Sequence, residues 1–260
     1  MSRIADAFAT CRAEGRAAFV AFLTASYPDD ARFLEAATAV LRHADALEVG
    51  LPFSDPLGDG PVIQRASEAA LAGGASAART LELVTALRAT TDKPILVMTY
   101  YNPVFCFPGG EGEFVRAAKA AGVDGLILPD LPPDEGAELI AAARTADLDT
   151  VFLVAPTSTP ERLALVTAAC RGFVYAVSVT GVTGARDSVP AEVAGLVAAV
   201  KAVTDLPVAV GFGVGSAASA RRVAAVADGV VVGSALVSTL ERGEALGPLA
   251  AELAAGCMRD

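Results

Sequence analysis

Short apolar runs recur along this chain, and each is followed by a stretch with helical spacing. The runs are rich in β-branched residues and lack polar alternation, so they predict strands that are buried on both faces. The predicted strands are residues 18–24, 46–50, 94–99, 125–128, 150–154, 173–177, 207–210 and 229–232. The predicted helices are residues 3–14, 29–41, 62–88 with an interruption at 73–74, 111–121, 134–146, 160–170, 190–203 and 217–226, with helical sequence thereafter.

This pattern amounts to eight strand–helix units after one N-terminal helix. Eight such units in a chain of 260 residues predict an α/β fold, a (β/α)₈ TIM barrel with an extra N-terminal helix. A doubly wound open sheet is the main alternative, although it usually has fewer units at this length. No stretch resembles a linker, so residues 1–260 are expected to form a single domain.

One acidic residue interrupts the second apolar run. Glu48 stands in Ala-Leu-Glu-Val-Gly, and a buried carboxylate is costly unless it is paired. A loop rich in proline and glycine follows and returns a second carboxylate, Asp59, toward the end of the same strand. Two carboxylates in different environments can divide proton donation and acceptance between them. The alternative is that Glu48 lies on an edge strand and Asp59 caps a helix.

Glycine-containing segments follow the last three predicted strands. Because glycine lets backbone N–H groups approach an anion closely, and barrels often bind phosphate in their late loops, these segments predict a phosphate site. Each segment alone is equally typical of an ordinary tight turn. The segments are Thr180-Gly181-Val182-Thr183-Gly184, Gly211-Phe212-Gly213-Val214-Gly215-Ser216 and Gly233-Ser234-Ala235.

Several aromatic residues lie at strand ends, where a barrel has its active site. Phe22, Tyr100, Tyr175 and Phe212 could together enclose a flat apolar ligand. Taken singly, each is more typical of a core residue.

Composition narrows the function classes. With 53% hydrophobic residues the chain can build a large core, and its net charge of −10 without a basic cluster argues against nucleic acid. No apolar run is long enough for a membrane helix and the first residues do not resemble a signal peptide, so we expect a cytoplasmic protein without membrane association. A single histidine and four dispersed cysteines argue against a metal site.

The motifs themselves resemble those of the tryptophan synthase alpha subunit family. The resemblance extends from about residue 19 to residue 237, and its first motif is highly specific. The matching segments are Leu47-Glu48-Val49-Gly50-Leu51-Pro52-Phe53-Ser54-Asp55-Pro56-Leu57-Gly58-Asp59-Gly60-Pro61-Val62-Ile63-Gln64, Tyr100-Tyr101-Asn102-Pro103, Pro129-Asp130-Leu131-Pro132, Gly181-Val182-Thr183-Gly184, Gly211-Phe212-Gly213 and Gly233-Ser234.

The resemblance implies a lyase of tryptophan biosynthesis that cleaves indole-3-glycerol phosphate to indole and glyceraldehyde 3-phosphate. It implies that Glu48 is the general acid and base, and that Asp59 binds the indole N–H and stabilises the cationic intermediate. Thr183 would close onto Asp59 and exclude water. The implied indole-enclosing residues are Phe22, Tyr100, Tyr175 and Phe212, and the implied phosphate-binding residues are Gly184, Gly213, Gly233 and Ser234.

The resemblance also implies a partner. Members of the family pass indole to a β subunit that carries pyridoxal phosphate (PLP), in an α₂β₂ heterotetramer, and no cofactor is expected in this chain. The implied partner-facing residues are Asp55, Pro56, Asn102 and Pro132, which solvated turns would explain equally well. The alternatives are a stand-alone lyase that releases free indole, a non-catalytic regulatory barrel that binds a phosphate ligand and, less favoured, another barrel enzyme acting on a sugar phosphate.

Two local departures from the family pattern stand out. Ala25-Ser26-Tyr27-Pro28 stands where many members have Gly-Asp-Pro, which puts contacts of that loop in doubt. Gly58 stands where alanine is common and predicts that the acidic loop is more mobile when no ligand is bound.

Overall fold

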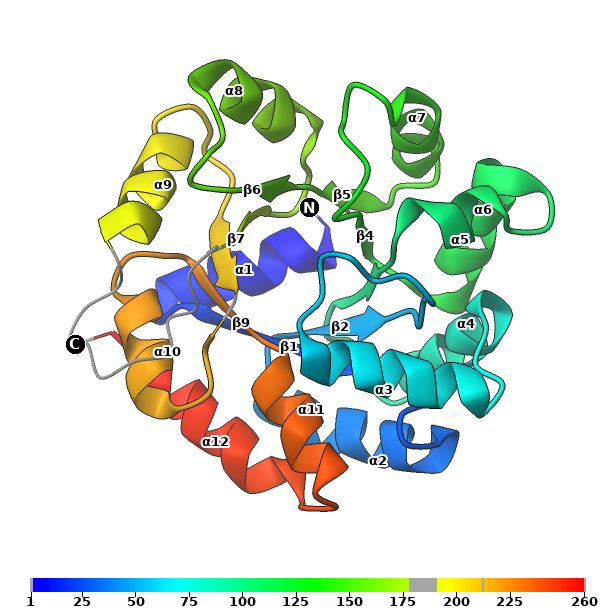
Figure 1. Ribbon diagram of the computed structural model, residues 1–260. Coiled ribbons are helices and arrows are strands. Elements are labelled where there is room, and N and C mark those ends of the chain that lie inside the picture. Colours follow the sequence, from blue (N-terminus) through cyan, green and yellow to red (C-terminus); the bar gives the residue numbers. More distant parts are fainter. Residues whose placement is uncertain (1, 178–190, 212, 260) are drawn as a thin grey trace.

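A computed structural model describes residues 2–177, 191–211 and 213–259, which form a nearly closed parallel barrel ringed by helices (Figure 1). The strands are β1 Ala18–Thr24, β2 Ala46–Gly50, β3 Ile95–Met98, β4 Gly125–Ile127, β5 Asp149–Val151, β6 Leu153–Val154, β7 Val174–Val177, β8 Val208–Gly211 and β9 Gly229–Val232. The helices are α1 Arg3–Ala13, α2 Asp30–Leu41, α3 Pro61–Ala72, α4 Ala77–Arg88, α5 Tyr101–Phe105, α6 Gly110–Ala121, α7 Ala137–Thr145, α8 Pro160–Ala169, α9 Ala191–Lys201, α10 Ala217–Ala224, α11 Ser234–Glu241 and α12 Leu246–Gly256.

The strands follow the order β5-β4-β3-β2-β1-β9-β8-β7-β6, with every neighbouring pair parallel. This order confirms the predicted (β/α)₈ barrel and excludes the open doubly wound sheet. The expected helix break at 73–74 is also present, because α3 ends at Ala72 and α4 begins at Ala77. That residues 1–260 fold as a single domain stays a prediction.

The predicted fifth strand is where the structure departs from the sequence pattern. Residues 150–154 do not form one strand, because Phe152 separates β5 from β6. The Phe152 N–H donates to the Cys170 thiol at 3.4 Å instead of to a neighbouring strand. As a result β5 pairs with β4 while β6 pairs with β7. Between β5 and β6 the ring of strands is continuous only because the two strands are consecutive in the chain.

Side chains inside the barrel form a core separate from the one between strands and helices. The inner cluster consists of Ile4, Phe8, Cys11, Ala18, Val20, Ala46, Leu96, Ile127, Val151, Phe173, Tyr175, Ala209 and Val231. Its first three members belong to α1, which lies across the ring of strands (Figure 1). Glycines on β4 and β9 make room for this helix: a Cβ at Gly125 would lie 2.9 Å from Ile4, and one at Gly229 would lie 2.9 Å from Phe8.

Aspartates at the amino ends of strands link neighbouring strands. Asp45, Asp124 and Asp228 stand immediately before β2, β4 and β9. Each carboxylate accepts a backbone N–H from an adjacent strand: Phe19 at 2.8 Å, Ile95 at 2.9 Å and Val208 at 3.0 Å. Each is also paired with a cation, and the partners are Arg16 at 2.6 Å, Arg88 at 2.5 Å and Lys201 at 3.0 Å. The charged side chains at the amino end of the barrel therefore neutralise one another.

Candidate active site

A cavity of about 110 Å³ lies at the carboxyl ends of the strands. Its lining residues come from five strands, the loop before α3 and its first turn, and the segments after β8 and β9. They are Phe22, Glu48, Asp59, Gly60, Ile63, Met98, Tyr175, Gly213, Val214, Val231, Gly233 and Ser234. Both predicted catalytic carboxylates therefore face the same cavity, at the end of the barrel where such folds place their active sites.

Glu48 is the deepest charged residue of this cavity. It lies on β2 between its register partners Phe22 on β1 and Leu96 on β3, and its side chain is fully buried. Neither of its carboxyl oxygens has a hydrogen-bond partner among the described residues. Burial without a compensating cation raises the pKa of Glu48 to about 8. At neutral pH this side chain is therefore protonated and carries a transferable proton. The edge-strand alternative is wrong, because β2 pairs with a strand on each side.

Missing side chains at two strand ends leave room for the aromatic walls. A Cβ at Gly50 would lie 2.4 Å from the ring of Phe22, and a Cβ at Gly211 would lie 2.3 Å from the hydroxyl of Tyr175. Such separations are far below van der Waals contact, so no other residue fits at either position unless the ring moves. The two glycines thus leave the space that the rings of Phe22 and Tyr175 occupy.

Asp59 reaches the cavity from the loop between β2 and α3. The loop ends at Gly60, and Pro61 begins the helix, as proline commonly does. Gln64 fixes this junction because its side-chain amide donates to the Asp59 carbonyl at 2.8 Å. The Asp59 carboxyl is partly buried; burial raises its pKa to about 6, although a hydrogen bond from Tyr100 acts in the opposite direction.

The two carboxyl groups consequently have different charge states near neutral pH. The pKa of Glu48 is raised to about 8 and that of Asp59 to about 6. Between these values one carboxyl is protonated and the other is ionised, an arrangement that separates a proton donor from a stabilising anion.

The far side of the cavity is formed by backbone. Gly213 has a left-handed φ of 75°, a conformation that favours glycine. Gly233 and Ser234 stand at the start of α11, and Gly233 gives the helix no side-chain cap. The first N–H groups of α11 are thus available to an anion entering the cavity, and the helix dipole favours negative charge there.

Most sequence-predicted site residues for which the structure has a description meet in this cavity. Phe22, Tyr175, Gly213, Gly233 and Ser234 line it together with the two carboxylates. Tyr100 is buried at the end of β3 but does not line it. Thr183, Gly184 and Phe212 lie outside the described residues.

Apart from Val214, which lies in one of the predicted phosphate-binding segments, three apolar lining residues were not predicted from the sequence. Met98 and Val231 stand near the ends of β3 and β9, at positions that point into the barrel, and Ile63 lies in the first turn of α3. Counting every second residue inward along each predicted strand, starting from Glu48 and its register partners, would have identified the first two. Ile63 carries no such signal because a helix position gives no register with a strand.

The predicted partner-facing residues lie in consecutive segments between strands and helices at the same end of the barrel, with Asn102 on the short helix α5. Asp55 and Asn102 are exposed, while Pro56 and Pro132 are half-buried. These segments follow β2, β3 and β4, which are neighbours in the sheet.

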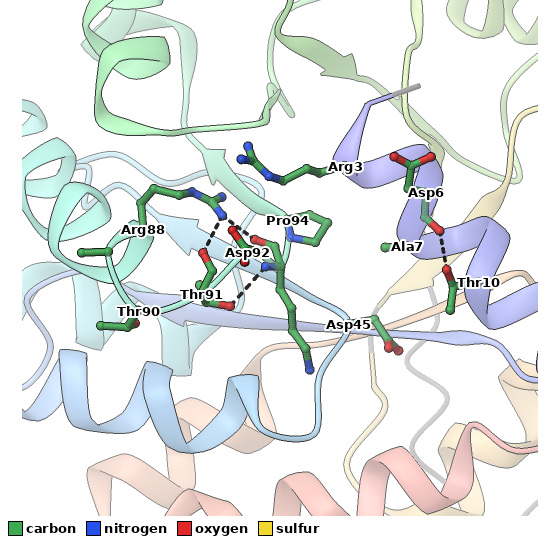
Figure 2. A pocket seen from close by; sticks show the side chains of 12 residues that line it. Arg3, Asp6, Ala7, Thr10, Asp45, Arg88, Thr90, Thr91, Asp92 and Pro94 are labelled. Carbon is green, nitrogen blue, oxygen red and sulfur yellow. Dashed lines mark hydrogen bonds between the residues drawn. The ribbon is translucent and has the colours of Figure 1, made fainter.

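A wider cavity, about 730 Å³, opens at the opposite end of the barrel between α1 and the segment before β3 (Figure 2). Its cationic side chains are already engaged. Arg88 donates to the carbonyls of Thr91 and Lys93 as well as to Asp124, and the Lys93 amine donates to the carbonyls of Leu41 and Ala44. These contacts link the ends of strands and helices, so Arg88 and Lys93 have a structural role in this cavity.

The described part of the chain offers no group of three or more His, Cys, Asp and Glu side chains that could hold a metal ion. None of its helices is long and apolar enough to cross a membrane.

Comparison of the chain with known proteins identifies one family. The tryptophan synthase alpha chain family profile matches residues 8–255. The tryptophan synthase alpha chain of Deinococcus radiodurans is 57% identical over 260 residues, covering 100% of this chain and 96% of that protein. The tryptophan synthase alpha chain of Mycobacterium bovis is 51% identical over 257 residues, covering 98% of this chain and 94% of that protein.

Solved structures agree with the sequence comparison. A structure of Mycobacterium tuberculosis tryptophan synthase superposes with a TM-score of 0.93 at 48% identity, covering 100% of this chain and 99% of that chain. Tryptophan synthase subunit alpha from Legionella pneumophila gives a TM-score of 0.90 at 32% identity, covering 99% and 98%. The chain therefore belongs to the tryptophan synthase alpha chain family.

Proposed function

We propose that this chain is the lyase that cleaves indole-3-glycerol phosphate to indole and glyceraldehyde 3-phosphate in tryptophan biosynthesis. The observation that carries the proposal is the pair of carboxyl groups in one cavity, of which Glu48 is fully buried and without a hydrogen-bond partner among the described residues. Membership of the family supports the same activity.

Glu48 would act as the general acid and then as the general base. Cleavage breaks the bond between C3 of the indole ring and the glycerol carbon, and this requires a proton on C3 and removal of the proton from the adjacent hydroxyl. Because burial raises the pKa of Glu48 to about 8, the side chain is protonated at neutral pH and can donate to C3. The resulting carboxylate then accepts the hydroxyl proton as the aldehyde forms, which restores the starting protonation state.

Asp59 would stabilise the charge that this protonation creates. Protonating C3 places positive charge on the ring nitrogen, and an ionised carboxylate that accepts the N–H hydrogen bond lowers the energy of that cation. The pKa of Asp59 is raised only to about 6, so the side chain is ionised at neutral pH while Glu48 is not.

The remaining cavity residues would hold the two halves of the substrate. Phe22 and Tyr175, with Met98, form apolar surfaces for the indole ring. Backbone N–H groups of Gly213 after β8, and of Gly233 and Ser234 at the start of α11, would bind the phosphate. The roles of Thr183, Gly184 and Phe212 stay predictions.

We also propose that this end of the barrel binds a β subunit that carries PLP, as in an α₂β₂ complex. Apolar side chains are unusually exposed on the loops that bear the predicted partner-facing residues: Leu57 is 94% exposed and Phe105 is 62% exposed. A groove of about 400 Å³ lined by Phe53, Pro56 and Leu57 among others lies beside them. Exposed apolar groups gathered on one face are typical of a protein interface. Localisation in the cytoplasm stays a prediction.

The direct test is indole release from indole-3-glycerol phosphate by the purified chain, with and without a β subunit. We expect slow release that rises with the partner. Phe105→Glu should retain the basal rate and lose the stimulation, because Phe105 lies outside the substrate cavity. Fast release that the partner does not change would favour a stand-alone lyase, and no release in either condition would favour a phosphate-binding barrel without activity.

A further inference from the structure

Tyr100 contacts the acidic loop at two places, the backbone of Gly58 and the ring of Phe53. Its hydroxyl oxygen accepts the N–H of Gly58 at 2.9 Å, and the same phenol lowers the pKa of the adjacent Asp59 carboxyl. Its ring packs against Phe53 with the ring centroids 5.3 Å apart. The side chain is buried, yet it does not line the substrate cavity. Tyr100 thus touches the loop that carries Asp59 rather than the space that would hold the indole ring.

The other hydrogen bonds of this loop come from its own strand–helix unit. Leu57 and Asp59 donate their N–H groups to loop carbonyls, and Gln64 of α3 donates to the carbonyls of Pro56 and Asp59. Within the described ranges, Tyr100 is the only side chain from another unit that forms a hydrogen bond with residues 53–60. It therefore joins the loop after β2 to the end of β3.

We propose that Tyr100 is a positioning residue for the lyase reaction, whose hydroxyl fixes the Asp59 carboxylate where the indole N–H arrives. This inference rests on the proposed function. A loop rich in proline and glycine has several accessible arrangements, and the stabilising anion must occupy one place when positive charge develops. The Tyr100 hydroxyl holds the backbone of Gly58, the residue next to Asp59, and so selects that arrangement before the substrate binds.

Gly58 is part of the same contact. A Cβ at position 58 would lie 3.2 Å from the Tyr100 hydroxyl oxygen, closer than ordinary van der Waals contact. Glycine here lets its N–H come within hydrogen-bond distance without steric pressure on the phenol. Glycine at a position where alanine is common in the family therefore favours this hydrogen bond.

The electrostatic surroundings of Asp59 make its hydrogen bond measurable. Burial raises the pKa of Asp59 and the Tyr100 hydrogen bond lowers it. The other titratable groups nearby are Tyr175 on β7 and Glu48 on β2, both of which are neutral at neutral pH, while Asp130 lies near Tyr100. Removing the Tyr100 hydroxyl should therefore raise the pKa of Asp59 further.

The test compares Tyr100→Phe with Tyr101→Phe in the full-length chain. Tyr101 is a matched control because it is the next residue and its hydroxyl donates to Glu111 on α6, away from Asp59. Tyr100→Phe should lower kcat by about tenfold with little change in KM, and should move the acidic limb of the pH profile to higher pH. Tyr101→Phe should behave as the wild type.

A carboxyl ¹³C NMR titration of Asp59, assigned with Asp59→Asn, gives a second reading that needs no activity. The signal should titrate near about 6 in the wild type and at a higher pH in Tyr100→Phe. An unchanged titration would overturn the inference, as would a rise in KM at constant kcat, which would make Tyr100 a binding wall. If the wild-type chain released no indole, the proposed function would fail, while this titration would still decide whether Tyr100 sets the state of Asp59.

Discussion

The carboxylates at the two ends of this barrel have opposite environments. At the amino end, Asp45, Asp124 and Asp228 each accept a backbone N–H and pair with an arginine or lysine. At the carboxyl end, Glu48 and Asp59 meet no cation among the described residues, and burial raises the pKa of both. The charges of the first group are neutralised within the fold, whereas the carboxyl groups of the second remain available to a substrate.

The carboxylates that stabilise the fold therefore lie at one end of the barrel, and the carboxyl groups proposed for catalysis lie at the other. A buried carboxylate that is paired and hydrogen-bonded strengthens the links between strands, whereas one without a partner costs stability and holds a proton that it can transfer. Barrels commonly divide their ends in this way. Substitutions at the two ends should therefore have opposite signatures.

The largest effect is expected from Glu48→Gln at the carboxyl end. The amide cannot transfer a proton to C3, so kcat for indole release should fall about 10³-fold, within the usual range for a general acid. The fold should persist, because the amide is nearly the same shape as the protonated acid. Indole release and thermal unfolding of the same sample measure both effects. Near-wild-type turnover would remove Glu48 from the mechanism.

At the amino end, Asp124→Ala should show the reverse. It leaves the guanidinium of Arg88 without its carboxylate and the Ile95 N–H without an acceptor, which should lower the free energy of unfolding by about 3 kcal/mol. The kcat of the folded fraction should not change. Asp92→Ala is the control, since this exposed carboxylate lines the same cavity, and it should change stability by less than about 0.5 kcal/mol. Equal losses in both variants would contradict the assigned role of Asp124.

A smaller effect is expected where glycine makes room for an aromatic wall. Gly211→Ala would place a Cβ 2.3 Å from the Tyr175 hydroxyl. The displaced ring should cost about 1–3 kcal/mol of stability and raise KM. Gly195→Ala serves as the comparison, because nothing lies within 4 Å of the added Cβ in α9, and it should be neutral or stabilising. Urea unfolding and steady-state kinetics distinguish the two, and an unaffected Gly211→Ala would show that the ring adjusts freely.

The smallest effect is the pH dependence of stability itself. The pKa of Glu48 is raised from 4.5 to about 8, so in this range the folded chain holds a proton that the unfolded chain has released. Its contribution is fully present below the unfolded value and is lost as pH rises through the folded value. From pH 6 to pH 7, the free energy of unfolding should fall by about 1.4 kcal/mol more in the wild type than in Glu48→Gln. Parallel curves would mean that Glu48 is already ionised when folded.

The sequence predicted much of the carboxyl end. Eight apolar runs without alternation indicated a barrel, and a lone acid in one of them indicated Glu48 as a functional residue. These signals are local: strand burial and an unpaired charge are both visible in a few consecutive residues.

The amino end was hidden because its interactions join distant residues. No sequence signal near Asp124 predicts its contacts with Arg88 and Ile95. The glycines at 125 and 229 are explained only by the packing of α1 inside the barrel. The break at Phe152 is equally non-local, because the Cys170 thiol that accepts its N–H lies eighteen residues away. Tyr100 was predicted to enclose indole, but its contacts with the loop became visible only in the structure.

The most direct test of the central claim is the pH dependence of kcat/KM for indole-3-glycerol phosphate cleavage, which reports the ionisations of the free enzyme. One protonated and one ionised carboxyl in the same cavity predict a bell-shaped profile. Activity should fall on the acidic side near about 6 as Asp59 gains a proton, and on the basic side near about 8 as Glu48 loses one. A profile that stays flat across this range would contradict the assignment of the two carboxyl groups.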